Sequence, residues 1–372
     1  MAALVKDPHN IRLGLAGMLR DNHHPFSWSA IINGGYDAQA TGRFADPVIL
    51  RYLSAQPPQS LGIRGARVTH IWCDDPEDAQ RVAAASKVPH VVSRPQDLLG
   101  QVDAVLIPTD RGQEHVARAR LYVEAGIPVF IDKPLADREQ DLRQFQAWVA
   151  QGKAIMSCSA LRFSVEFAAC RRRIREVGRL KLITITMVNS WERYGMHALE
   201  GVYPFLPAGG WLSVVNTGSD GWGDLVHAQH GSGVALVAAV APGLSGAMGH
   251  LRLYGSDGML EARFSDSFRA FKAQLSAFVD YLRTGVPPFD FQETVELTRL
   301  LIAGIRSREE GGRRVMLAEI ASEEAATAGV SDSLTPTRRQ RQSRSAASAP
   351  NQTRTPIHRR REDDLVSKDK TK

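Results

Sequence analysis

Two residues that can take part in proton transfer, Asp132 and Lys133, stand directly after a short apolar run. Residues 128–131 are Pro-Val-Phe-Ile, with Gly126 in front and Pro134 behind, which predicts a buried parallel strand rather than a helix. Ligands of open α/β sheets gather at the carboxyl ends of such strands. A lysine at that edge can donate a hydrogen bond or a proton to a substrate oxygen. The alternative is that Asp132 and Lys133 form a solvated pair at a strand end.

An earlier strand, predicted over residues 11–16, ends at Gly17. A turn that binds the pyrophosphate of a dinucleotide usually has glycines at three spaced positions, of which Gly17 would be the first. The other two positions hold Leu19 and Asn22, so only one third of this fingerprint is present.

A second candidate cofactor contact follows the next predicted strand, residues 67–73. An acidic residue at this point, here Asp74, can accept hydrogen bonds from the ribose hydroxyls of NAD and would repel the 2′-phosphate of NADP. The alternative is that Asp74 or Asp75 caps the next helix. His23 and His24 are further candidates to contact the cofactor's phosphates.

Strands and helices alternate up to residue 135, which predicts a Rossmann-type, doubly wound parallel sheet with an insertion at about 36–64. After Lys133 the pattern changes to an α+β arrangement with a largely antiparallel open sheet. We therefore expect a dinucleotide-binding domain over 1–135 and a substrate and oligomerisation domain over 136–325. A disordered basic tail is predicted for 326–372 because Ser, Arg, Thr, Gln and Pro dominate it.

Composition excludes several classes of protein. The chain has 372 residues, 43% hydrophobic and 23% charged, as in soluble globular proteins, and we expect no membrane span. The net charge of +6 belongs to residues 331–372, which hold 11 Lys or Arg and 5 Asp or Glu, so the fold itself gives little reason to expect nucleic-acid binding. The three cysteines show neither a disulfide framework nor a metal-binding pattern, which favours a cytoplasmic location.

These features together resemble the Gfo/Idh/MocA family, named after glucose–fructose oxidoreductase and inositol dehydrogenase. The resemblance covers roughly residues 10–320. It rests on these segments: Gly126–Ala136 with its Asp-Lys-Pro, Leu161-Arg162-Phe163, Gly195-Met196-His197, Pro287–Glu293, and Arg306–Val315, which is similar to the family's closing signature.

The resemblance implies a fold, an activity and a set of site residues. It implies an NAD(P)-dependent oxidoreductase, with NAD favoured, that acts by hydride transfer on a hydroxyl or carbonyl of a sugar, cyclitol or related polyol. It also implies a homo-oligomer formed through the C-terminal sheet. Lys133 would contact the reacting oxygen and His197 would exchange a proton with it. The cofactor contacts implied are Gly14, Gly17, Asp74, Pro108, Thr109, Asp132 and Lys133.

Two departures from the family pattern fall on the chemistry. Arg193 stands where the family has an aspartate, and Glu200, one helical turn past His197, is a candidate replacement on the same face. With Arg162, these residues are the predicted substrate contacts. The eroded glycine fingerprint is the second departure. The sequence therefore also allows a homologue with a degraded cofactor site that acts as a non-redox or ligand-binding protein.

Overall fold

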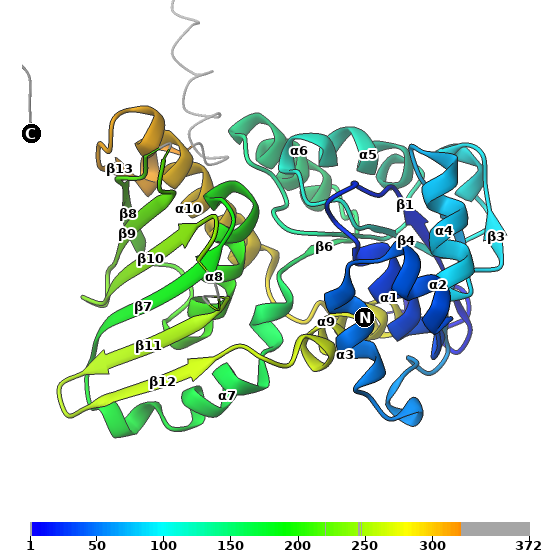
Figure 1. Ribbon diagram of the computed structural model, residues 1–372. Helices are drawn as coiled ribbons and strands as arrows, with labels where there is room; N and C mark the ends of the chain where they lie inside the picture. The colour runs from blue at the N-terminus through cyan, green and yellow to red at the C-terminus, as the bar shows by residue number, and fades with distance from the viewer. Residues whose placement is uncertain (1, 220, 245, 247, 321–372) are drawn as a thin grey trace, which may run out of the picture. The chain divides into compact units, whose positions relative to one another are not determined.

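The computed structural model describes residues 2–219, 221–244, 246 and 248–320. Within this part of the chain two β-sheets form, one wholly parallel and one mixed (Figure 1). The predicted tail, 326–372, lies outside the described residues.

The first sheet has six strands in the order β3-β2-β1-β4-β5-β6. Every pairing in it is parallel, as expected for a doubly wound sheet that binds ligands where the strand order reverses. Strand β6 pairs with β5, so this sheet continues past residue 135, where the sequence places a domain boundary. The strands are β1 (Ile11–Ala16), β2 (Ala66–Trp72), β3 (His90–Val91), β4 (Ala104–Ile107), β5 (Val129–Ile131) and β6 (Ile155–Ser157).

Local sequence explains where the helices of this half begin and end. Helix α1 has a proline in its first turn and ends at Gly34, whose φ of 79° is the left-handed conformation that suits glycine. Helix α4 begins after Asp75, whose side chain accepts a hydrogen bond from Glu77 N. The helices are α1 (His24–Asn33), α4 (Pro76–Ser86), α5 (Gly112–Glu124) and α6 (Glu139–Ala150).

The predicted insertion is helical. It contains α2 (Ala38–Phe44) and α3 (Pro47–Ser54), which are capped by the side chains of Asp37 and Asp46. The apolar face of α3 joins the same core as α1 and the last long helix of this half, α9 (Ser267–Thr284). Helix α9 therefore packs against the first sheet although it lies far along the chain (Figure 1).

The second sheet has seven strands in the order β12-β11-β7-β10-β9-β8-β13. Strands β7 and β10 are parallel and the other pairs are antiparallel, which confirms the predicted fold class of a parallel sheet plus a largely antiparallel one. The strands are β7 (Leu180–Val188), β8 (Trp211–Asn216), β9 (Asp224–His230), β10 (Ala235–Ala241), β11 (His250–Gly255), β12 (Met259–Arg263) and β13 (Val315–Met316).

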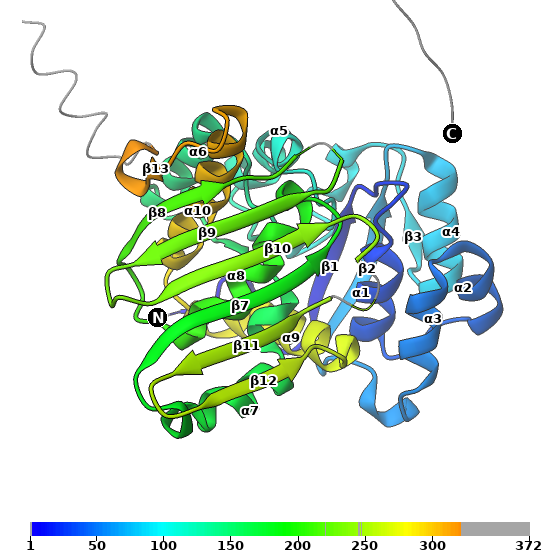
Figure 2. The same ribbon diagram turned by 60° about the vertical axis from the view of Figure 1, so that its left-hand side comes forward.

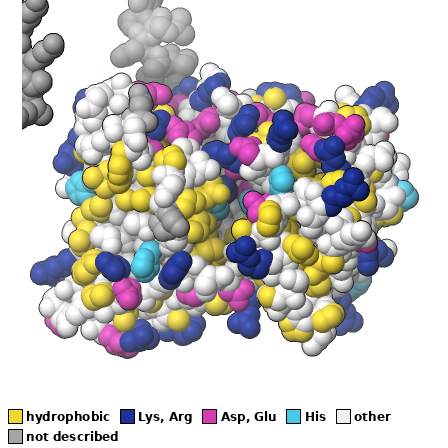
Figure 3. Space-filling model, in the orientation of Figure 1, with side chains coloured by type: hydrophobic (Ala, Val, Ile, Leu, Met, Phe, Trp, Pro, Cys, Tyr) yellow, Lys and Arg dark blue, Asp and Glu magenta, His cyan; other side chains and the backbone are white. Residues whose placement is uncertain are grey.

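One face of the second sheet is covered and the other is open. Helices α7 (Val165–Arg172), α8 (Met196–Val202) and α10 (Phe291–Glu309) belong to this half, and Figure 2 shows the strands in front of α8 and α10. Alternate strand residues are fully buried on the helix side and only half-buried on the other. Figure 3 shows hydrophobic side chains gathered over this half of the molecule.

Two further observations concern the cysteines and the hydrophobic character of the helices. The three cysteines are unpaired and buried. None of the helices among the described residues has both the length and the apolar character needed to cross a bilayer.

Candidate functional site

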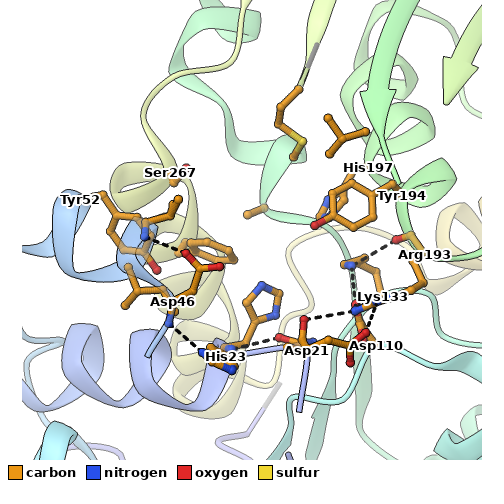
Figure 4. Close-up of a pocket in the computed structure, with 18 of the residues that line it drawn as sticks. Asp21, His23, Asp46, Tyr52, Asp110, Lys133, Arg193, Tyr194, His197 and Ser267 are labelled. Atoms are coloured by element: carbon orange, nitrogen blue, oxygen red, sulfur yellow. Dashed lines mark hydrogen bonds and ion pairs between the residues drawn. The ribbon is translucent and has the colours of Figure 1, made fainter. Parts of the chain in front are cut away.

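A cleft of about 850 Å³ lies where the carboxyl ends of β1, β4 and β5 face the second sheet (Figure 4). Its floor is polar and holds Lys133, Asp110 and Arg193, while much of its wall is aromatic or aliphatic. Pockets of this composition, apolar with a few convergent polar groups, are typical of small-molecule sites. Other side chains that line it are Asn22, His24, Tyr52, Leu161, Tyr194, His197 and Phe271.

Lys133 is buried at the bottom of this cleft, with its side chain only 2% exposed. Its Nζ lies 3.6 Å from Asp110 Oδ2 and donates a hydrogen bond to the Arg193 carbonyl oxygen at 3.2 Å. The ammonium group also lies over the Tyr194 ring, 5.2 Å from its centre. These contacts fix the lysine amino group at one point of the cleft floor.

Asp110 is shared between two cations. Besides Lys133, it accepts hydrogen bonds from the Arg193 guanidinium at 2.8 and 3.0 Å. Burial alone would push the pKa of Asp110 up, but the charges of Lys133 and Arg193 outweigh it and hold the pKa below its ordinary value. Asp110 is therefore an anion beside Lys133.

Arg193 joins the two halves of the site. It lies in a π-helical turn before α8, and its guanidinium pairs with Asp110 and with Asp21, 2.6 Å away, in the turn after β1 (Figure 4). The predicted substrate contact therefore lines the cleft, but its charge is already matched by two carboxylates.

His197 enters the cleft from α8. Its Nδ1 lies 2.6 Å from Ser159 Oγ, and its ring meets the edge of Tyr194. Burial, reinforced by the positive charges of Lys133 and His24, lowers the pKa of His197 well below its ordinary value. At neutral pH the ring is therefore a neutral imidazole, and since a serine hydroxyl both donates and accepts, Ser159 can partner either tautomer.

Glu200 and Arg162 lie behind His197 rather than among the residues that line the cleft. Glu200 is fully buried, accepts a hydrogen bond from Ser159 N at 3.3 Å and is ion-paired with Arg162, which also reaches Glu293. Burial raises the pKa of Glu200 although Arg162 opposes it. The prediction that Glu200 replaces the missing aspartate at the substrate is not supported, because helical spacing alone does not show which face meets the cleft.

His24 forms a close pair with the predicted cofactor residue Asp132. His24 Nδ1 lies 2.5 Å from Asp132 Oδ2, and the other carboxylate oxygen accepts a hydrogen bond from Lys133 N. Asn22, in the third glycine position, donates to the Pro108 carbonyl oxygen and lies 3.4 Å from Asp132. The side chain of Asn22 thus ties the turn after β1 to the ends of β4 and β5.

The turn after β1 differs from a standard pyrophosphate turn. Gly17 has a φ of 101°, a backbone conformation that favours glycine, and the end of the Arg118 side chain lies beside it, with Nη1 2.9 Å from where a Cβ would be. Arg118 also pairs with Asp74 at 2.9 Å and with Glu114. The other predicted glycine, Gly14, lies inside β1, where a Cβ would meet Val102 and Leu98, so its position serves packing.

Of the two acidic residues after β2, Asp75 caps α4 and Asp74 is the one that faces Arg118. Asp74 is half-exposed just after β2, where the sequence predicts a contact to the ribose. Two buried side-chain oxygens nearby, Thr109 Oγ1 and Asp110 Oδ1, form no hydrogen bond with the described residues. Unpartnered buried oxygens of this kind are positions that a bound ligand can satisfy.

Comparison with known proteins agrees with this geometry. Residues 41–159 match the Gfo/Idh/MocA family model, described as an oxidoreductase family with an NAD-binding Rossmann fold. The match covers less than half of the chain and shows that this segment resembles the family. The resemblance predicted from the sequence is therefore confirmed, and with it the coarser statement that the relatives are NAD-binding oxidoreductases.

Solved structures similar to the chain include inositol dehydrogenases. The myo-inositol dehydrogenase of Corynebacterium glutamicum is 20% identical, with a TM-score of 0.62 over 83% of this chain and 99% of that one. The scyllo-inositol dehydrogenase of Lactobacillus casei, solved with NAD(H) and scyllo-inositol, is 16% identical, with a TM-score of 0.64 over 83% and 99%. At such identities the similarity establishes the fold. A comparison with curated protein sequences gave no match.

Sequence reasoning missed three parts of this site. Asp110 comes shortly after the apolar run of β4, as Asp132 comes after that of β5, so its position was a usable signal. The other two parts are the hydrogen bonds between Ser159 and His197 and between Asp132 and His24. Each joins residues far apart in the chain, so no local sequence pattern predicts it.

Proposed function

We propose that the chain is a nicotinamide-dependent oxidoreductase that interconverts a hydroxyl and a carbonyl on a neutral polyol, sugar or cyclitol. The observation that carries this proposal is the meeting of a buried lysine and a neutral histidine in one cleft, Lys133 from the first sheet and His197 from α8. One group can hold the oxygen's charge and the other can exchange its proton.

The residues around the cleft suit a dinucleotide at its nicotinamide end. Thr109 and Asp110 carry unpartnered buried oxygens at the carboxyl end of β4, and Asp132 and Lys133 stand at the end of β5 beside them. At the phosphate end, the Arg118 guanidinium lies against Gly17 and is ion-paired with Asp74 and Glu114, and a cofactor phosphate would compete with these carboxylates for it. NAD is favoured over NADP because the carboxylate of Asp74 at the end of β2 would repel a 2′-phosphate.

In the direction of oxidation, His197 accepts the hydroxyl proton of the substrate at Nε2. Its lowered pKa keeps that nitrogen free at neutral pH, and Ser159 accepts the hydrogen of Nδ1. Lys133 donates a hydrogen bond to the same oxygen and stabilises the negative charge that develops as the proton leaves. The nicotinamide ring, when bound, supplies the hydride acceptor.

The charges of the floor favour a neutral substrate. Lys133 and Arg193 are both held by Asp110, and Arg193 also by Asp21, so no cation of the floor is left without a carboxylate. An acidic substrate would bring a further negative charge to carboxylates that are already ionised, whereas hydroxyl groups can donate to them.

The interpretation as a ligand-binding homologue with a degraded cofactor site gains no support. Burial of a charged lysine beside an anion costs desolvation free energy. A homologue that only binds a ligand would have no need to keep Lys133 in that position.

The experiment that tests the proposed function measures absorbance at 340 nm with NAD⁺ or NADP⁺ and a panel of polyols that begins with myo-inositol and scyllo-inositol. We expect NADH formation with at least one neutral polyol and a lower rate with NADP⁺. Absence of turnover across neutral polyols, together with no binding of either reduced cofactor, would overturn the proposal.

We also propose that the open face of the second sheet is a contact between copies of this chain. Large apolar side chains lie exposed on it, among them Leu225, at 43%. Light scattering should give a mass above that of one chain, and Leu225→Lys should reduce it. A monomer at micromolar concentration would contradict this.

A further inference from the structure

A second imidazole faces the cleft, and hydride transfer at a single carbon does not use it. We propose that His24, held by Asp132, is a second catalytic base that removes a proton from the carbon next to the substrate's carbonyl group. The chain would then catalyse redox-neutral proton exchange on 2-hydroxyketones. The proposal for His24 rests on the proposed function in one respect, the class of substrate.

The pairing with Asp132 fixes which nitrogen of His24 is free. Asp132 is buried, with its side chain 2% exposed, and its Oδ1 accepts from Lys133 N, while Oδ2 lies 2.5 Å from His24 Nδ1. An ionised carboxylate only accepts hydrogen bonds, so Nδ1 carries the hydrogen and donates it. In the neutral ring the lone pair is then on Nε2, to which no described residue hydrogen-bonds.

The ring is also held in place by its neighbours. It stacks on Trp28, with ring centres 5.2 Å apart and planes 16° apart, and Phe271 meets it edge-on at 5.1 Å. The backbone N–H of His24 donates to Asn22 Oδ1 at 3.0 Å. A side chain that lines a cleft, is 19% exposed and is fixed on three sides is oriented for proton transfer rather than free to turn away.

His24 and His197 differ in what they can do. His197 has a hydroxyl partner, Ser159, and no carboxylate bonded to it. His24 has a buried carboxylate that stabilises the imidazolium formed when Nε2 takes a proton, the arrangement by which acidic side chains assist catalytic histidines. His24, Lys133 and His197 all line the same cleft, so the three groups face one space.

Lys133 can stabilise the charge on an oxygen, and His24 and His197 can each transfer a proton. Together they suit a substrate with oxygens on adjacent carbons. Lys133 and His197 engage the carbonyl oxygen, and His24 Nε2 faces the neighbouring carbon. The C–H bond there breaks, its electron pair becomes the C=C bond of an enediolate, and the carbonyl oxygen takes the negative charge beside Lys133. The proton stays on His24 and exchanges with solvent before the steps reverse, so nothing is oxidised or reduced.

The test uses 2-keto-myo-inositol at millimolar concentration in D₂O, with the full chain and without added dinucleotide. Proton NMR follows the loss of signal at the carbons next to the carbonyl, and a sample without protein gives the uncatalysed rate. We expect exchange at least tenfold above that rate. We expect His24→Asn to lower the catalysed rate about a hundredfold, as for the loss of a general base, and Asp132→Asn about tenfold.

His90 provides a control outside the cleft. It lies on β3, is exposed and is not among the residues that line the cleft. His90→Asn should keep most of the exchange activity. Melting temperatures of the variants show whether each is folded, and Asp132→Asn keeps the size of the side chain if His24→Asn does not fold.

The outcomes separate this proposal from the proposed dehydrogenase. Exchange without hydride transfer in the wild-type chain would support His24 as a base and count against the dehydrogenase. Hydride transfer without exchange would overturn the role of His24. Equal exchange rates in wild type and folded His24→Asn would overturn it as well.

Discussion

Replacement of Lys133 by methionine tests the chemistry of the cleft directly. Methionine has a similar length and no charge, so Lys133→Met removes the donor to the substrate oxygen while it fills most of the same space. Loss of one donor aimed at a developing oxyanion costs about 10²–10³ in kcat, or roughly 3–4 kcal/mol of transition-state stabilisation. We therefore expect a fall of at least a hundredfold in kcat.

The folded state should tolerate this change. Asp110 loses a cation 3.6 Å away but keeps two hydrogen bonds from Arg193, so no unpaired buried charge is left. We expect a loss of about 1.5–3 kcal/mol in the free energy of unfolding, the range for one hydrogen bond to a charged group. Urea denaturation checks this value.

The assay is the initial rate of NADH formation with the best polyol of the panel, with Lys153→Met as control. Lys153 lies on the loop before β6, outside the cleft, and its replacement should leave kcat unchanged. A kcat for Lys133→Met within threefold of wild type would refute the role given to this lysine.

Three further predictions concern the cofactor turn, the acid–base group and the buried ion pairs. Arg118→Met should weaken NADH binding about tenfold in calorimetric titrations, because the charge at the Gly17 turn is lost; Arg120→Met, on the same helix but away from that turn, should not. Burial lowers the pKa of His197, so this base stays deprotonated at pH values below the ordinary histidine pKa of about 6.5. The oxidation rate should therefore fall on the acid side only below that pH. Ser159→Ala removes the acceptor for Nδ1–H and should move this fall to a still lower pH. Arg162→Met should cost about 3–5 kcal/mol in urea denaturation, since it leaves a buried carboxylate without its cation; a loss below 1 kcal/mol would show that the pair is not needed.

Most of the fold was predictable because its signals are local. The apolar run before Lys133 and the one before Gly17 are both buried strands, and the breaks at Gly126 and Pro134 mark the ends that the structure shows. The second sheet was predicted from alternating residues such as those of β7. The place of α9 against the first sheet was not predictable, because its apolar face fits any core and its partners lie about 250 residues earlier in the chain.

The site was predictable in part, for physical reasons that differ from residue to residue. Lys133 and His197 were found because a strand end and a family motif mark them. Glu200 was predicted to face the substrate, and it is not among the residues that line the cleft, because a helix has several faces and which of them meets a cleft depends on tertiary packing. Asp74 was correctly seen at a strand end, but its pairing with Arg118 depends on a helix that is distant in sequence.

Transfer of a labelled hydride tests the central claim most directly. The chain is incubated with 2-keto-myo-inositol and NADH deuterated at C4, with each of the two stereochemical forms in a separate sample, in ordinary water. Mass spectrometry and NMR then locate the label in the product. We predict that one form gives inositol with deuterium at the former carbonyl carbon and that Lys133→Met slows its appearance at least a hundredfold. Product without the label from either form, or no product at all, would contradict the account.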